Sequence, residues 1–265
     1  MTAVYLQSLS LAAPGLPGWS DSRLVLVGEQ AYQAQPLAAF KPSLLRANER
    51  RRTTQVINLA LQAAQEAMTE GSPTATQVGS VFASSGGDYA IIDKLCTALN
   101  LPGKPVSPTH FHNSVHNAAA GYWTIATGCM QSSTSLSAYD WSFSTGLLEA
   151  VTFTQVEGLP VLLVAYDYPP PFPLSEARPL QAPFATALLL SPELTTTALG
   201  ELRLQLTNQG PEDQLDSSEL ERLRTGNPAA RSLPLLQTIA RMTSRTVTLP
   251  YLAGQYLNVE FSPCR

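Results

Sequence analysis

The stretch SSTSLSAYDWSFSTGLLEAVTFTQVEGLPVLLVAYD, residues 132–167, joins three segments of different character. Residues 132–139 are strand-like, residues 140–157 predict a helix, and residues 159–167 form a continuous apolar run. Such a run is typical of a strand that is covered on both faces. A strand, a helix and a buried strand in succession indicate a sheet with helices packed against it.

The same alternation extends over most of the chain, without an internal repeat. Further strands are predicted at residues 2–13, 78–85 and 183–191, and further helices at residues 51–69, 86–100 and 117–128. In the first of these helices the apolar residues recur at helical spacing. We therefore expect an α/β fold whose sheet is layered with helices.

The composition becomes polar after about residue 205, where we expect a surface linker. Residues 227–242 then predict a helix with Asn227 as N-cap and Pro228 in its first position, and residues 247–262 predict one or two strands. This remainder is too short for a core of its own. We therefore expect a single domain with its main part at residues 1–205 and a short C-terminal extension, residues 206–265, packed on it.

Charge and composition exclude several classes of function. The 265 residues are 44% hydrophobic and 14% charged with a net charge of −4, and no basic cluster is long enough for a nucleic-acid footprint. The basic run RANERRR, residues 46–52, predicts the exposed start of a helix or a docking site for an acidic partner. Cys96, Cys129 and Cys264 are too few and too irregular for a disulfide framework. Without an apolar run that could span a bilayer, and without Lys or Arg before Arg23, we expect a cytoplasmic protein.

All three histidines, His110, His112 and His116, lie in SPTHFHNSVHNAAAGYW, residues 107–123. Their H-x-H-x3-H spacing is compatible with three imidazole ligands to zinc. However, the sequence has no HExxH pattern and no cysteine pair beside them, and Pro108 suggests a loop. We therefore expect hydrogen-bonded polar residues in a buried loop, with no metal and no cofactor.

Two turns are candidates for nucleophilic or ligand-binding chemistry. FASSGGD, residues 82–88, lacks the G-x-S-x-G motif of a nucleophile elbow. Gly86 and Gly87 are therefore expected to permit a tight turn. The alternative is that backbone amides of this turn hold a ligand. Asp140 falls where a strand ends and a helix begins. A nucleophile there would gain from the helix dipole, but aspartate is also a favoured N-cap, and capping is the simpler explanation.

Together these pieces resemble the N-terminal half of the β-ketoacyl synthases, the condensing enzymes of fatty acid and polyketide assembly. SPTHFHNSVHNAAAGYWTIATG carries an N-x-A-A-G motif of that family, and SAYDWSFSTGLLEA follows at the nucleophile turn. The residues that match the first motif are Asn117, Ala119, Ala120 and Gly121. Counting on from it, Asp140 falls on the nucleophilic cysteine, and Gly146 lies in the helix that follows. The resemblance implies a thiolase-like half-fold with a mixed sheet.

The sequence is more closely similar to a short ketosynthase-like subfamily whose members act like chain length factors beside a complete ketosynthase in bacterial aryl-polyene clusters. The shared signatures are ANERRR, FHNSVHNAAAGYW, GLLEA and VLLVAYD, within about residues 1–200. Two departures from an active synthase stand out. Asp140 supplies a carboxylate, which is a poor acyl-transfer nucleophile, and no histidine follows His116. The resemblance therefore implies a subunit that does not condense malonyl units by itself.

The same resemblance implies the partners. The chain would pair with an active β-ketoacyl synthase as a heterodimer, and an acyl carrier protein would deliver the substrate to the complex. In such enzymes the loop before the N-x-A-A-G motif crosses the dimer interface and helps to close the floor of the partner's acyl tunnel. By resemblance that loop consists here of Phe111, His112, Asn113, Ser114, Val115 and His116. Asn117, Gly121 and Gly146 would hold the structural motif around it.

Two other functions stay open. One is an independent acyl-transferring or hydrolytic enzyme that uses Asp140 with His112 or His116. It requires a histidine within hydrogen-bond reach of the carboxylate and an oxyanion pocket. The other is a homodimeric scaffold without any ligand.

Overall fold

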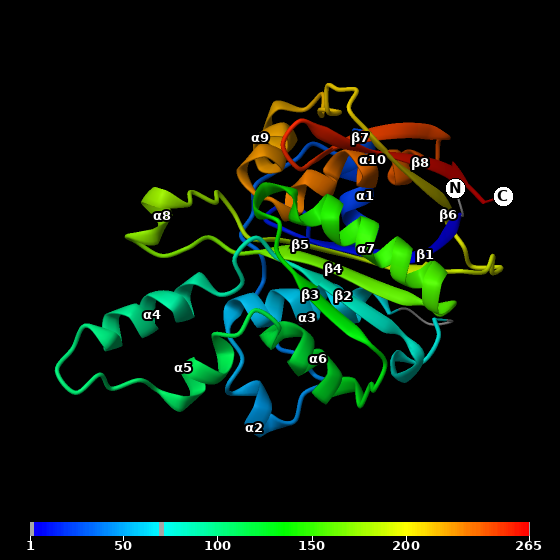
Figure 1. The fold of residues 1–265 in the computed structure, drawn as a ribbon. Helices are drawn as coiled ribbons and strands as arrows, with labels where there is room; N and C mark the ends of the chain where they lie inside the picture. The colour runs from blue at the N-terminus through cyan, green and yellow to red at the C-terminus, as the bar shows by residue number, and fades with distance from the viewer. Residues whose placement is uncertain (1–2, 69–71, 265) are drawn as a thin grey trace.

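The computed structural model describes residues 3–68 and 72–264 as an α/β fold on one mixed eight-stranded sheet (Figure 1). The strands lie in the order β3-β2-β4-β5-β1-β6-β8-β7. Their bounds are β1 Val4–Ala12, β2 Gly79–Ala83, β3 Ser133–Leu136, β4 Val161–Asp167, β5 Phe184–Ser191, β6 Gly200–Thr207, β7 Arg245–Tyr251 and β8 Gln255–Pro263. β2 is parallel to β3 and β4, and the other neighbouring strands are antiparallel. The predicted α/β fold with a mixed sheet is confirmed.

Helices cover both faces of the central strands. Their bounds are α1 Trp19–Val27, α2 Ala47–Arg50, α3 Gln55–Ala67, α4 Tyr89–Leu99, α5 Pro108–Asn113, α6 Ala118–Thr127, α7 Ser142–Glu157, α8 Leu174–Ala177, α9 Ser218–Gly226 and α10 Leu233–Arg241. α3 and α6 pack on one face (Figure 1), and α7 lies between the central strands and β7. Within the described residues, no helix is both long and apolar enough to cross a membrane.

β4 shows why its sequence is apolar without alternation. Val161, Leu163 and Ala165 belong to the core around α7, whereas Leu162 and Val164 belong to the core around α3 and α6. All five side chains are buried. Because helices cover both faces of this strand, no position along it faces water, and the pattern predicted for residues 159–167 is explained.

A close contact with the sheet positions α7. A Cβ atom added to Gly146 would lie 2.7 Å from the Cβ of Ala83 on β2 and 3.1 Å from Cδ1 of Leu163 on β4. Carbon atoms in contact are normally about 3.5–4.0 Å apart. Glycine at position 146 therefore lets the helix approach the strands more closely than any other residue would, and this sets the position of α7 relative to β2 and β4.

Several predicted ends differ from the structure. The helix predicted at 51–69 begins at Gln55, because the side chain of Thr54 accepts a hydrogen bond from the backbone N–H of Ile57 (3.3 Å) and caps it. The basic run before it forms the separate short helix α2. The sequence also gave no sign of α1, which follows a Pro/Gly-rich stretch. The predicted ends at residues 2 and 69 lie outside the described residues.

The helix predicted at 227–242 is divided into a 3₁₀ turn, Ala229–Ser232, and α10. Asn227 lies just before the N-cap of this turn, Pro228, and its side-chain oxygen accepts a hydrogen bond from the N–H of Ala229 (2.8 Å). It does not cap α10, which has Pro234 in its first turn. A proline lacks the N–H that a preceding turn would need, which is why a new helix starts here.

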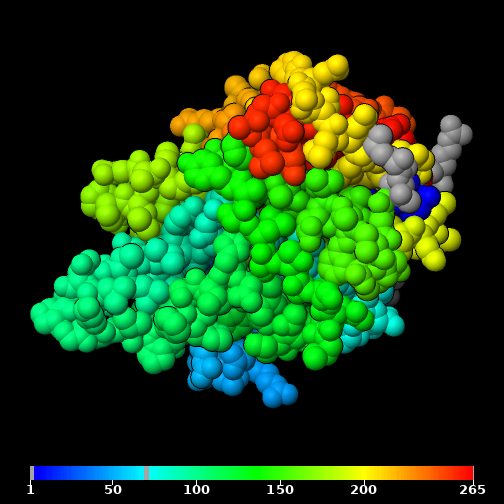
Figure 2. Space-filling model, viewed as in Figure 1, coloured from blue at the N-terminus to red at the C-terminus, as the bar shows by residue number. Residues whose placement is uncertain are grey.

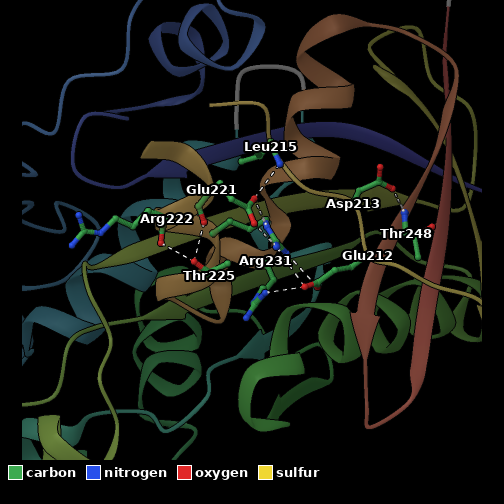
Figure 3. Close-up of polar contacts among 9 residues, drawn as sticks. Glu212, Asp213, Leu215, Glu221, Arg222, Thr225, Arg231 and Thr248 are labelled. Atoms are coloured by element: carbon green, nitrogen blue, oxygen red, sulfur yellow. Dashed lines mark hydrogen bonds and ion pairs between the residues drawn. The ribbon is translucent and has the colours of Figure 1, made fainter. Parts of the chain in front are cut away.

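The polar segment after β6 is not a simple surface linker, so that prediction is wrong. It contains α9, and the guanidinium group of Arg224 is almost completely buried there. Arg224 pairs with Glu221 at 2.6 Å and with Glu212 at 3.2 Å, and Arg231 also reaches Glu212 at 3.4 Å (Figure 3). Composition was misleading because charged residues that pair with one another can be buried.

The C-terminal region completes the sheet. β6 crosses the boundary predicted at residue 205, and β8 pairs with β6 along its whole length. β7 then forms the edge of the same sheet. The division into residues 1–205 and 206–265 stays a prediction.

Candidate functional site

The junction between β3 and α7 carries residue 140. β3 ends at Leu136, a 3₁₀ turn spans Tyr139–Trp141, and α7 begins at Ser142. Tyr139 has φ +54°, a left-handed conformation that costs a residue with a side chain about 1–2 kcal/mol. The hydroxyl of Ser142 donates to the carbonyl of Tyr139 (2.7 Å) and accepts from the N–H of Ala138 (3.0 Å), which holds the strained turn in place.

Asp140 does not cap α7, contrary to the prediction. Trp141 occupies the N-cap position, and no side chain makes the capping hydrogen bond. The carboxylate of Asp140 instead lies 2.7 Å from Nη2 of Arg178, and the guanidinium carbon of Arg178 lies 3.8 Å from the ring centroid of Tyr139. Burial, the largest effect, lowers the pKa of Arg178, but hydrogen bonding to Asp140 and Tyr89 outweighs it and raises the pKa. The arginine is therefore charged, and its positive charge is paired with the carboxylate of Asp140.

A second carboxyl group, which the sequence analysis missed, lies buried at the end of β4. Oδ1 of Asp167 accepts hydrogen bonds from the hydroxyl of Ser84 (3.0 Å) and from the N–H and hydroxyl of Ser85 (both 2.8 Å). Burial raises the pKa of Asp167 to about 6, although the two serines and the charge of Arg178 lower it. The serines of FASSGGD therefore hold a buried carboxyl group, and Gly87, at φ +65°, permits the turn that was predicted there.

The three histidines do not converge. His110 lines a cavity of about 530 Å³ together with Arg51, Arg52 and Lys94. The ring of His112 meets that of Tyr122 edge to face. His116 has Nε2 3.1 Å from the carbonyl of Ser84. Within residues 3–68 and 72–264, no set of three or more His, Cys, Asp or Glu side chains is placed to hold a metal ion.

His116 follows the short helix α5, whereas His110 and His112 lie within α5 and not in the loop that was predicted. Pro108 occupies its first turn, where a missing N–H does no harm, and Ser107 caps it through the N–H of His110 (3.4 Å). Asp140 has its ion pair with Arg178 and none with a histidine. The Asp–His pair that an independent enzyme would need is therefore not formed in this structure.

Large apolar side chains are exposed on α5, on α6, and in the turns that follow α5, α6 and β3. Their exposed fractions range from 51% to 94%. The residues are Phe111, Val115, Ile125, Met130 and Tyr139. We call this set the apolar face. The segments from α5 to α7, coloured green, form much of the surface in the view of Figure 2.

The predicted interface residues divide between the surface and the interior. Phe111, His112 and Val115 are exposed, and they line a groove of about 440 Å³ together with Gly121. Asn113 is buried instead. Its side chain donates to the carbonyl of Arg52 (2.7 Å) and accepts from the hydroxyl of Tyr122 (3.2 Å).

The remaining predicted residues lie beside these. Ser114 and His116 are half-buried. Asn117 precedes α6 and makes no capping hydrogen bond. Gly121 has nothing within 4 Å of an added Cβ, so the isolated chain does not require glycine there. Gly146 does require it, as described above.

The fold and the strand-to-helix junction define this chain as a thiolase-like protein of the ketosynthase type. Residues 25–251 match the family described as "Beta-ketoacyl synthase, N-terminal domain", and the chain belongs to that family. No curated protein gives a significant match to the sequence.

Solved structures of known complexes share the fold. The chain is similar to one of "Ketosynthase (ApeO) in Complex with its Chain Length Factor (ApeC) from Xenorhabdus doucetiae", with 21% identity, a TM-score of 0.74, and coverage of 98% of this chain and 100% of that one. It is also similar to an acyl-carrier protein–ketosynthase complex of a type II polyketide synthase, AntDE:AntF, at 12% identity, TM-score 0.76 and 99% coverage of both chains. The ishigamide ketosynthase/chain length factor gives 12% identity, TM-score 0.72 and full coverage of both chains.

Proposed function

We propose that this chain is a catalytically inactive ketosynthase-like subunit, a chain length factor, which pairs in the cytoplasm with an active β-ketoacyl synthase and shapes the acyl tunnel of that partner. The product would belong to aryl-polyene or related polyketide or fatty acid biosynthesis. The observation that carries the proposal is the ion pair between Asp140 and Arg178, at the position where the family resemblance places the nucleophile.

The chemistry at residue 140 supports an inactive subunit. A carboxylate is a weak nucleophile towards a thioester, and the ion pair between Asp140 and a guanidinium group withdraws more of its electron density. No histidine follows His116 in the sequence, so the groups that drive decarboxylation and stabilise the enolate in active synthases have no counterpart. The chain would therefore depend on the partner for both halves of the condensation.

The apolar face supports a permanent partner. Phe111, Val115 and Ile125 are more than half exposed and line one groove, and exposed apolar side chains that lie together are typical of surfaces that another chain covers. β3 lies at the edge of the sheet and, among residues 3–68 and 72–264, pairs with β2 alone, so its other side is available to a second chain. A partner of this kind is supported by the similar solved structures, which are named for complexes of a ketosynthase with a chain length factor.

Phe111 is our candidate for the residue that limits chain length. Its ring projects from α5 and is largely exposed in the isolated chain, beside the groove that also contains Val115. In the proposed complex this ring would lie at the floor of the partner's tunnel. Because a ring cannot be compressed, an acyl chain that reaches it would stop growing, and a smaller residue would permit a longer chain.

The cavity beside His110 supports the delivery of substrate by an acidic carrier protein. It is lined by Arg51, Arg52 and Lys94, whereas Asp88 is its one lining carboxylate. Positive charge on a chain with a net charge of −4 would orient an acidic partner towards this region. We propose that the acyl carrier protein reaches the complex on this side.

Co-purification with the ketosynthase of the same organism tests the pairing. We expect a stable one-to-one complex in native mass spectrometry, in which condensing activity requires the cysteine of the partner and survives Asp140→Ala. Val115→Asp and Ile125→Asp should each abolish the complex, because a charge cannot be buried without a partner. Leu194→Asp is the matched control, since Leu194 is an exposed apolar residue outside the apolar face.

The outcomes separate the alternatives. Longer products from a complex with Phe111→Ala would support the role in chain length, and an unchanged product length would contradict it. Thioester turnover by the chain alone that is lost with Asp140→Ala would indicate an independent enzyme. A homodimer that ignores the ketosynthase would indicate a scaffold.

A further inference from the structure

The segment between β4 and β5, residues 168–183, carries Arg178 to the junction. We call this segment the α8 arm, since it contains α8 and projects from the body of the molecule (Figure 1). Although the arm lies at the surface, the side chain of Arg178 is only 13% exposed, because it turns inward from the end of α8. The arginine is the arm's charged contact with the start of α7.

Arg178 contacts residue 140 and also the residue that precedes it. Its Nη2 lies 2.7 Å from Oδ1 of Asp140, and its guanidinium plane lies over the ring of Tyr139. The buried carboxyl group of Asp167 is also near enough to respond to its charge. The guanidinium group therefore contacts one carboxyl group and one aromatic ring, and its charge acts on a second carboxyl group.

The loss of the nucleophile does not require any of these contacts. A lone aspartate at the start of a helix would be satisfied by the backbone amides of its first turn. Here Asp140 makes no such bond, and its side chain is 41% exposed. The guanidinium group of Arg178 is therefore in direct contact with residue 140, where a group bound to that residue would meet it.

We propose that Arg178 seals the ancestral acyl site of this chain, so that the site is closed by a guanidinium group as well as emptied of its nucleophile. The inference rests on the proposed function, because only the family resemblance identifies residue 140 as the acyl-bearing position. A sealed site would keep the growing chain on the partner. It follows that a thiol at residue 140 is not sufficient to restore acylation, and that Arg178 must be removed as well.

Two probes of an introduced cysteine test the seal in the purified full-length chain. Asp140→Cys is compared with Asp140→Cys/Arg178→Ala, and the modification of residue 140 is followed by peptide mass mapping, which separates it from Cys96, Cys129 and Cys264. Iodoacetamide is small and reports the thiolate. Decanoyl-coenzyme A is long, and its thioester carbonyl is attacked by the thiolate, so that a new thioester forms and the coenzyme A thiolate leaves and takes a proton from water.

The two probes should respond in opposite directions. With Arg178 present, the pH midpoint of alkylation should be lower, because a neighbouring guanidinium group favours the thiolate. At equal thiolate fraction, decanoyl transfer should be about tenfold faster without Arg178, since the guanidinium group stacked on Tyr139 must otherwise be displaced first. Asp140→Cys/Arg222→Ala is the matched control, because Arg222 contacts the arm through Gln181 (3.2 Å) and should change neither result.

Equal rates of decanoyl transfer with and without Arg178, or equal alkylation midpoints, would overturn the proposal. Circular dichroism verifies the fold, and Arg178→Gln replaces the alanine variant if that variant is unfolded. A further measurement does not need an introduced cysteine. Phenylglyoxal should modify Arg178 about tenfold faster in Asp140→Asn than in the wild type, because the ion pair is lost. Equal rates of modification would also overturn the proposal. None of these results depends on complex formation, so failure of the pairing and failure of the seal are distinguishable.

Discussion

Alanine substitutions at Gly146 and Gly121 should have opposite effects on stability, although both glycines lie inside helices. Alanine is favoured over glycine in a helix interior by about 0.8–1 kcal/mol. At Gly121 the added methyl group meets nothing within 4 Å, so this gain should appear in full as an increase in the free energy of unfolding. The isolated chain should therefore become more stable by up to about 1 kcal/mol.

At Gly146 the same methyl group would lie 2.7 Å from the Cβ of Ala83, about 1 Å inside an ordinary carbon contact. Both atoms are attached directly to backbone, so neither can rotate away, and α7 must move from the sheet. Overpacking of this kind costs about 1–3 kcal/mol, which exceeds the gain in helix propensity. We expect a net destabilisation of about 1 kcal/mol and a decrease in melting temperature of about 2–4 °C.

Urea unfolding followed by circular dichroism measures both effects, and a double-mutant cycle identifies the cause. Ala83→Gly removes the atom that clashes, so Ala83→Gly/Gly146→Ala should be more stable than the sum of the single variants predicts, by about 1 kcal/mol or more. If Gly146→Ala is as stable as the wild type, or if the two changes are additive, the close contact does not position α7 and our reasoning about it is wrong.

The remaining predictions concern buried charge. The pKa of Asp167 is raised from 3.8 to about 6 in the folded chain. Between these two pH values the folded state therefore holds a proton that the unfolded state releases. The stability that this proton contributes is present below about pH 4 and is lost as the pH rises through about 6. Asp167→Asn should abolish that loss. The stability of this variant relative to the wild type should therefore rise by up to about 3 kcal/mol between about pH 4 and 7. A difference in unfolding free energy that does not change with pH in urea titrations would contradict this. Arg224→Met leaves Glu212 and Glu221 without their buried partner and should lower the unfolding free energy by about 3 kcal/mol or more. Arg222 is exposed, so Arg222→Ala should change the unfolding free energy by less than about 0.5 kcal/mol. Similar losses from the two variants would refute the argument that burial makes Arg224 important.

Features that depend on local pattern were predictable from the sequence. The apolar run that became β4 has no alternation because both faces of the strand are covered, and only the interior of a layered sheet provides that environment. The junction at residue 140 followed from a strand-like segment that gives way to a helical one. The segment around Pro108 was misread, because proline marks a helix start as readily as a loop and Ser107 supplied the cap.

Features that depend on pairing between distant segments were not predictable. Nothing near Asp140 in the sequence indicates that Arg178 will reach it from another loop, and the simplest local role, a helix cap, was therefore expected instead. Asp167 ends an apolar run and gives no sign that Ser84 and Ser85 will enclose it. In each case the sequence shows the charge, but the fold decides whether that charge meets water, a backbone amide or an opposite charge.

The charges at the start of α7 are paired, whereas large apolar side chains elsewhere are exposed to water. This contrast favours a role in which the chain acts through its shape and not through catalytic groups. At the start of α7, where the family resemblance places reactive chemistry, the charges of Asp140 and Arg178 neutralise each other, so little remains there to act on a substrate. The apolar face is the reverse: Met130 is 94% exposed and Phe111 is 67% exposed, and the exposure of such side chains is unfavourable in water. A second chain that covers this face would be stabilised by it without any catalytic group from this one. Under the proposed function, selection would therefore act on the bulk of residues such as Phe111 rather than on nucleophiles.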